Sequence, residues 1–172
     1  YFLFRGKNVE ESGLKLIAET TWNLNNKIKI VIITDDLKGL EFNRENSFVV
    51  EGFQSSEFLK RFYDGALATL GQFSNDNRLQ HSIPHKVYEA AFFQRAYVTL
   101  CSPPLLEVFP KESFYCVNKP DESELAKVLV EIFNKPEVAI KKGKVMGAVY
   151  LKKYRQSELQ RKFDLEIGLN SD

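Results

Sequence analysis

The chain of 172 residues is long enough for one domain with a short extension. Apolar residues make up 44% and charged residues 27%, and 14 phenylalanines supply a core, so a disordered chain is excluded. The formal net charge of +1 gives no general electrostatic argument for a nucleic-acid partner. No apolar run approaches the roughly 20 residues of a membrane span, and we find no signal peptide. The chain opens on an apolar run rather than on Met, so we expect a piece of a longer protein.

Apolar, β-branched runs recur along the chain, each ended by charged residues, glycine or proline. The clearest covers residues 28–34 and is apolar on both faces, as in a parallel sheet covered by helices. We predict six strands, at residues 1–4, 28–34, 47–51, 66–70, 96–100 and 113–117.

Helical patterns alternate with these strands. Helices are expected over residues 11–24, after the N-cap Ser55, over 84–94, after the capping box that Asp121 forms with Glu124, and over 138–163. The alternation predicts an α/β fold, a Rossmann-like α/β/α sandwich around a parallel sheet. We divide the chain into a domain at 1–137, a basic C-terminal helix at 138–164 and a tail at 165–172. Cys101 and Cys116 do not suggest a disulfide framework, and we expect buried thiols.

In open parallel sheets, ligands bind beyond the carboxyl ends of the strands. The residues that follow the predicted strands are therefore candidates for function. They are Arg5–Lys7, Asp35–Asp36, Gly52–Phe53, 71–82 and Ser102.

The segment at residues 83–91 carries the most chemical information. Pro84 suits the first turn of a helix, whose free N–H groups and dipole favour an anion. Lys86 in that first turn opposes the dipole unless a phosphate binds there. Glu89 faces away from the apolar side of the helix, where a carboxylate can accept hydrogen bonds from two ribose hydroxyls. Alternatively, His85 and Glu89 form an exposed i, i+4 pair and Lys86 is solvated.

The pattern Pro84, Lys86, Glu89 and Ala90, followed by the strand at 96–100, resembles the donor-binding motif of GT-B glycosyltransferases of group 1 (family 4). The resemblance covers roughly residues 1–135. The opening Phe-Arg-Gly-Lys, Ser12–Leu14 and the Val-Val-x-Gly-Phe run that ends at Phe53 also agree with it in order. Three departures stand out. Ser12-Gly13 replaces the family's Lys-Gly turn, and His81 stands where the family often has a glutamate near the donor sugar. Ser82-Ile83-Pro84 replaces the family's Gly-Phe-Gly loop before the helix.

The resemblance implies a role for each matching residue. Glu89 would bind the ribose, Gly52 and Phe53 would lie near the base, and Arg5 and Lys7 would approach the diphosphate. We therefore assign candidate catalytic roles to Arg5, Lys7 and His81. Candidate substrate-binding residues are Glu89, Lys86, Pro84, His85, Ile83, Gly52 and Phe53.

The function that the resemblance implies is that of the C-terminal half of a retaining glycosyltransferase. This half would bind a UDP- or GDP-sugar for transfer to a glycan or lipid-linked acceptor in polysaccharide biosynthesis. Its partner would be a missing N-terminal half, without which it would be inactive. We expect a cytoplasmic enzyme. We also expect no cofactor or metal, because no Asp-x-Asp pair stands where a metal would bridge the phosphates: Asp35 and Asp36 are adjacent, and neighbours on a strand point opposite ways.

Several alternatives stay open. One alternative is a receiver-like or other non-catalytic Rossmann-like signalling or binding domain. Thr34-Asp35-Asp36, Thr99 and Lys119-Pro120 suggest a receiver, but a phosphoacceptor aspartate is missing after the strand at 66–70. A dehydrogenase half lacks a G-x-G-x-x-G motif after a strand. His81, His85 and Glu89 form a weak metal-site pattern. The basic stretch 141–162 can either pack on the missing half or lie peripherally on an anionic membrane.

Overall fold

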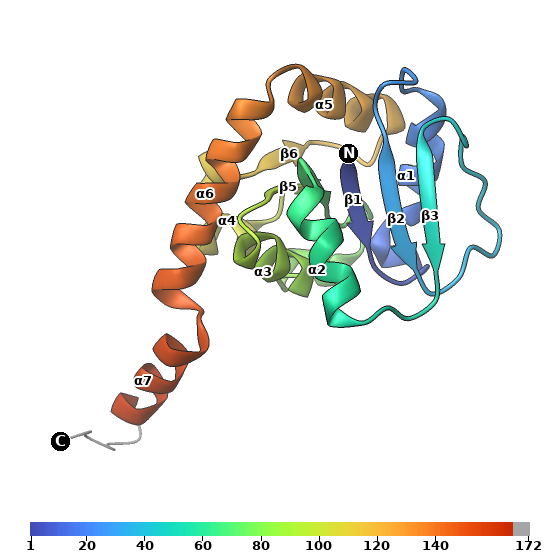
Figure 1. Cartoon of the computed structure of the whole chain (residues 1–172). Coiled ribbons are helices and arrows are strands. Elements are labelled where there is room, and N and C mark those ends of the chain that lie inside the picture. Colours follow the sequence, from blue (N-terminus) through green and yellow to red (C-terminus); the bar gives the residue numbers. More distant parts are fainter. Residues whose placement is uncertain (167–172) are drawn as a thin grey trace.

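A six-stranded parallel sheet forms the centre of the computed structural model, which describes residues 1–166 (Figure 1). The strand order is β3-β2-β1-β4-β5-β6, and all neighbours are parallel. The strands are β1 (Phe2–Arg5), β2 (Ile30–Thr34), β3 (Ser47–Glu51), β4 (Ala68–Leu70), β5 (Ala96–Leu100) and β6 (Tyr115–Val117). The predicted fold class is confirmed, and each predicted strand is present within a few residues of its expected bounds.

Helices cover both faces of this sheet. They are α1 (Leu14–Trp22), α2 (Ser56–Gly65), α3 (His85–Phe92), α4 (Pro103–Val108), α5 (Glu122–Asn134), α6 (Pro136–Lys153) and α7 (Gln156–Glu166). The apolar residues of α1 and α5 pack on one face, and those of α2, α3 and α4 on the other. α6 contributes to both, with Ala139 on the first face and Met146 on the second.

Alternation along β1 supplies both layers of the core. Phe2 and Phe4 join the cluster under α1 and α5, whereas Leu3 joins the cluster under α2. All three side chains are buried, and each contributes roughly 1.5–3 kcal/mol by leaving water. The strand between two helical layers is therefore apolar at every position, as residues 2–4 are.

The chain reverses direction across the sheet between β1 and β4. From β1 it first moves outward to β2 and β3, and it then returns to β4 on the other side. Loops diverge at such a switch point and leave a crevice at the carboxyl ends of the strands. The order differs from the 2-1-3-4-5 order of receiver domains, so the receiver alternative is wrong.

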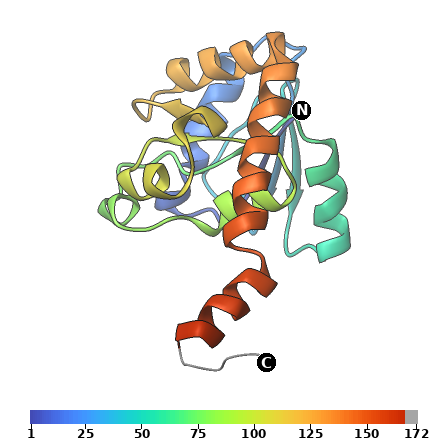
Figure 2. The ribbon, with the colours of Figure 1, turned by 90° about the vertical axis from the view of Figure 1, so that its left-hand side faces the viewer.

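The C-terminal region differs from the single helix that we predicted over 138–163. It forms two helices, α6 and α7, and the chain bends between them at Tyr154 (Figure 2). The Tyr154 ring lies 5.3 Å from that of Tyr88 and 6.3 Å from that of Phe109. Contacts with distant residues thus hold the bend. Of the predicted tail at 165–172, residues 167–172 lie outside the described residues.

The short helix α4 also escaped prediction. Pro103 and Pro104 looked like a stop signal after β5, but they occupy the first turn of α4. Proline fits there because the first N–H groups of a helix have no partner within it. Among the helices of residues 1–166, none has the length and apolarity needed to cross a bilayer.

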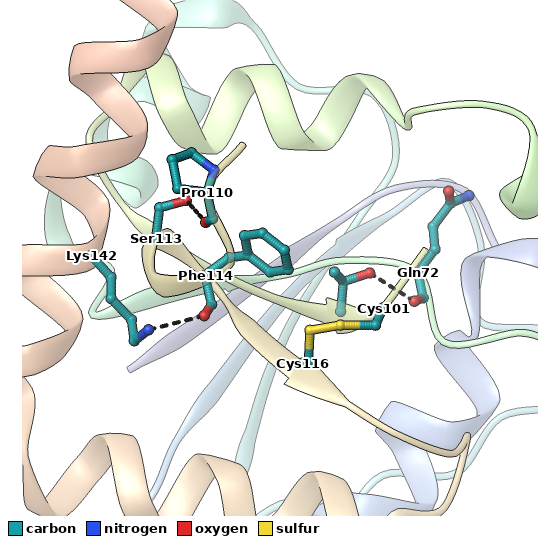
Figure 3. The surroundings of a disulfide bond; sticks show 8 residues. Gln72, Cys101, Pro110, Ser113, Phe114, Cys116 and Lys142 are labelled. Atoms are coloured by element: carbon teal, nitrogen blue, oxygen red, sulfur yellow. Dashed lines mark hydrogen bonds between the residues drawn. A yellow bond between two sulfur atoms is a disulfide. The ribbon is translucent and has the colours of Figure 1, made fainter. Parts of the chain in front are cut away.

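Cys101 and Cys116 form a disulfide, so the prediction of two buried thiols is wrong (Figure 3). Cys101 follows β5 and Cys116 lies in the neighbouring strand β6, where it pairs with Thr99. Their Cα atoms are 5.2 Å apart, within the usual range for a disulfide. This proximity depends on the register of β5 and β6, which the spacing of 15 residues does not reveal.

Removing this cross-link should destabilise the fold. A disulfide that closes a loop of about 15 residues contributes about 3 kcal/mol by restricting the unfolded chain. The double variant Cys101→Ser, Cys116→Ser should therefore unfold at lower denaturant than the oxidised wild type. Dithiothreitol should lower the denaturant midpoint of the wild type and leave that of the double variant unchanged. Identical midpoints for oxidised wild type and double variant would show that the bond does not form in solution.

Candidate functional site

A cavity of about 260 Å³ lies at the carboxyl ends of β1, β2 and β3. Gly52 allows the turn that closes its far side, because its φ of 94° is unfavourable for residues with a side chain. The Gly52 N–H also donates to the carbonyl of Thr34 at 2.8 Å, which joins the loop after β3 to the end of β2. The lining residues are Arg5, Gly6, Lys7, Ile33, Thr34, Asp35, Gly52, Phe53, Gln54 and Leu59.

The acidic pair at the end of β2 organises the loop after β1. The backbone N–H of Asn8 donates to Asp35 Oδ1 at 2.8 Å, and the Asn8 amide donates to Asp36 Oδ1 at 3.0 Å. The hydrogen bond from Asn8 lowers the pKa of Asp35. The two aspartates therefore fix the loop that follows Arg5 and carries Lys7.

Beside this cavity, Glu89 of α3 is held by two side chains from other elements. Arg5 Nη1 lies 2.7 Å from Glu89 Oε1, and the Tyr63 hydroxyl donates to Glu89 Oε2 at 2.5 Å. The exposed fractions of the Arg5 and Glu89 side chains are 37% and 31%, so both remain accessible. Glu89 is thus neither free in bulk solvent nor enclosed in the apolar interior. It contacts Arg5, which lines the cavity.

Lys86, one turn before Glu89, has a buried ammonium group without a hydrogen-bond partner. Its Nζ lies 4.1 Å from the centre of the Phe4 ring and occupies the space that a side chain on Gly6 would need. Burial lowers the pKa of Lys86 to about 8, against the opposing effect of Glu89. Since an unpaired buried charge is costly, this position favours an anion at the crevice.

A second cavity, of about 140 Å³, lies at the ends of β4 and β5 and has no charged side chain in its lining. The side-chain amide oxygen Oε1 of Gln72 and the Tyr97 hydroxyl in its wall are buried without hydrogen-bond partners. Its other lining residues are Ser74, Asn75, Leu79, Gln80, Pro84, Val87, Thr99, Leu100, Cys101, Ser102, Leu105 and Asn118.

The structure brings most predicted site residues to the first cavity or beside it. Four of them line it, and Lys86 and Glu89 adjoin it through Gly6 and Arg5; the four are Arg5, Lys7, Gly52 and Phe53. Pro84 instead lines the second cavity.

Three predicted residues of the loop and helix start lie elsewhere. His81 and His85 are exposed, and Ile83 packs against the apolar cluster under α3. Within residues 1–166, no group of three or more His, Cys, Asp and Glu side chains could hold a metal, so the alternative of a metal site at His81 and His85 gains no support.

Tyr63 is the residue of this site that the sequence did not reveal. It follows Phe62 in α2 and continues an apolar stripe with Leu59, so the sequence pattern predicts a core residue without a functional role. The available signal was its hydroxyl, because a buried tyrosine usually needs a hydrogen-bond partner.

Comparison with solved structures supports the fold. Neither a protein-family model nor a curated protein matches the chain. The C-terminal domain of a glycosyl transferase group 1 family protein, LpcC of Francisella tularensis, superposes with a TM-score of 0.69 at 12% identity over 90% of this chain and 86% of that one. Anabaena HepE in complex with UDP-glucose superposes with a TM-score of 0.79 at 8% identity, over 98% of this chain and 48% of HepE. Sucrose-phosphate synthase from Thermosynechococcus elongatus superposes with a TM-score of 0.71 at 14% identity, over 98% of this chain and 45% of the synthase.

The chain thus has the fold of the C-terminal domains of group 1 glycosyltransferases, and the predicted resemblance is confirmed at this level. It spans about half the length of HepE and of the sucrose-phosphate synthase.

Replacing Lys86 by a neutral side chain of similar length should stabilise the isolated chain. Lys86→Met removes the dehydration cost of the ammonium, so the free energy of unfolding should rise by about 1–3 kcal/mol below pH 8. The gain should shrink from pH 8 toward 10.5, where the folded protein releases a proton that the unfolded chain still binds. Chemical denaturation across pH measures this difference. The exposed Lys127→Met on α5 is the control, and an equal or lower stability of Lys86→Met would contradict the burial cost.

Proposed function

We propose that this chain is the donor-binding half of a glycosyltransferase and binds a nucleotide-diphosphate sugar, with UDP or GDP as the nucleotide. The observation that carries the proposal is the buried, unpaired ammonium of Lys86 at the switch-point crevice of this fold. Arg5 and Lys7 add two cations at the same edge of the sheet, and a diphosphate is the anion that such a cluster fits. The HepE structure with UDP-glucose supports the same class of ligand.

The three parts of the nucleotide then have separate places. The base lies against Gly52 and Phe53, whose ring is 96% exposed beside the cavity and available for stacking. The ribose hydroxyls bond to Glu89. The diphosphate lies between Arg5, Lys7 and Lys86, near the N–H groups of Ile83 and His85 at the start of α3, whose N-cap Pro84 makes no capping bond.

The chemistry follows from these positions. As the glycosidic bond to the donor breaks, negative charge develops on the departing diphosphate, and cations already in place lower the barrier. We propose a retaining transfer in which Arg5, Lys7 and Lys86 supply this charge stabilisation without a metal or other cofactor. His81, which ends the 3₁₀ turn at Asn77–Gln80, would approach the donor sugar in place of the family's glutamate.

A complete active site needs the N-terminal half as partner, with the acceptor between the halves. α7 offers it an apolar surface, because Leu159 and Phe163 are about half exposed. Several cations of the basic stretch are already engaged within the chain: Lys142 donates to the Phe114 carbonyl (Figure 3), and Glu158 pairs with Arg155 and Arg161. We therefore favour packing of the basic C-terminal stretch on the N-terminal half over its peripheral contact with the cytoplasmic face of a membrane. In either case the enzyme would serve polysaccharide biosynthesis.

Calorimetric titration with UDP and GDP tests the proposal. One of them should bind, and Glu89→Ala should weaken binding by about 1–3 kcal/mol through loss of the charged hydrogen bonds. Glu107→Ala, an exposed glutamate of α4, is the matched control and should leave the affinity unchanged. If neither nucleotide binds the folded chain, the proposed function is wrong.

Nucleotide affinity should also depend on pH through Lys86. In the free protein the pKa of this ammonium is about 8, and a bound diphosphate favours its charged form, so binding takes up a proton above pH 8. The affinity of the wild type should accordingly fall as pH rises from 8 to 10. Lys86→Met should bind more weakly and lose this dependence. A wild-type affinity that stays constant over the same range would remove Lys86 from the phosphate site.

A further inference from the structure

We propose that Tyr63 is a positioning residue for ribose recognition: its hydroxyl fixes Glu89 so that each carboxylate oxygen faces one of two adjacent hydroxyls. The inference rests on the proposed function and assigns a role to a residue outside the predicted site.

The arrangement of donors around Glu89 supports this role. Arg5 donates to Oε1 at 2.7 Å and Tyr63 to Oε2 at 2.5 Å, so each oxygen has one protein donor. A carboxylate offers about four acceptor positions, two on each oxygen. One position therefore remains on each oxygen, and this pair matches the 2′- and 3′-hydroxyls of a ribose.

Tyr63 is itself held in place. Its side chain is 4% exposed and lies in the apolar cluster with Leu3 and Ile33. Its ring stacks on that of Phe93, with 4.4 Å between the centres and 10° between the planes. The hydroxyl thus has a fixed position between α2 and α3.

The hydroxyl also keeps its proton. Burial, and then the negative charge of Glu89, raise the pKa of Tyr63 far above its ordinary value. Tyr63 is therefore always the donor in this hydrogen bond, and Glu89 keeps its remaining acceptor positions for the ligand.

The role of Arg5 differs from that of Tyr63. Arg5 lines the first cavity and 37% of its side chain is exposed, so a diphosphate can draw its guanidinium away from Glu89. Tyr63 lies on the buried side and has no such competitor. It holds the carboxylate orientation while Arg5 turns toward the phosphates.

Tyr63→Phe tests the inference, because it keeps the ring and its stacking and removes only the hydroxyl. Calorimetry should compare UDP, 2′-deoxy-UDP and inorganic pyrophosphate as ligands. In the variant, UDP affinity should fall roughly three- to tenfold, the effect of one hydrogen bond. Affinity for 2′-deoxy-UDP should fall less and that for pyrophosphate should stay unchanged, so the preference for UDP over 2′-deoxy-UDP narrows.

Two further variants separate positioning from a general loss of structure. Tyr88→Phe, a tyrosine of α3 that packs on Phe109 and Tyr154, should leave all three affinities unchanged. In the background of Glu89→Ala, adding Tyr63→Phe should cause no further loss, because Tyr63 acts through Glu89.

The outcomes distinguish this inference from the proposed function. If wild type binds UDP and prefers it to 2′-deoxy-UDP, but Tyr63→Phe keeps that preference in full, the positioning role is overturned and the proposed function stands. The positioning role is also overturned if pyrophosphate affinity falls as much as UDP affinity. If the wild type binds no nucleotide at all, the proposed function fails first.

Discussion

The carboxylate of Glu89 ties together three elements that are distant in sequence. It lies on α3, receives Arg5 from the end of β1 across 84 residues, and receives Tyr63 from α2 across 26 residues. Because the ion pair is only partly buried, its value lies less in stability than in geometry. It joins α3 to the end of β1, beside the cavity that Arg5 lines.

Lys86 works against stability at the same place. Its ammonium is buried without a partner, and it lies in the first turn of a helix, where the dipole already repels a cation. Gly6 has no side chain and so leaves the space that the ammonium fills. Folded proteins retain such costly arrangements mainly at functional sites, and the cost falls when an anion binds.

Much of the fold followed from the sequence, because buried parallel strands are apolar at every position and stand out in the pattern. Residues 28–34 predicted β2 for this reason. What the sequence hid depends on contacts between distant residues. The bend at Tyr154 follows from its packing on Tyr88 and Phe109, and the disulfide from the register of β5 and β6. That Arg5 and Gly52 line one cavity was predictable from the strand ends, and the position of Glu89 near that edge was predictable from the polar face of its helix. The position of Tyr63 required the packing of α2 on α3.

The start of α3 also separates two environments along the carboxyl edge of the sheet. On one side, the first cavity has Arg5 and Lys7 in its lining; on the other, the second cavity has only uncharged polar and apolar side chains. A diphosphate in the second cavity would leave its charges without partners, at a cost that the few hydroxyl and amide groups there cannot offset. Under the proposed function, charge would therefore direct the diphosphate to the side of Arg5, and it would orient the nucleotide on this sheet before any contact with its base.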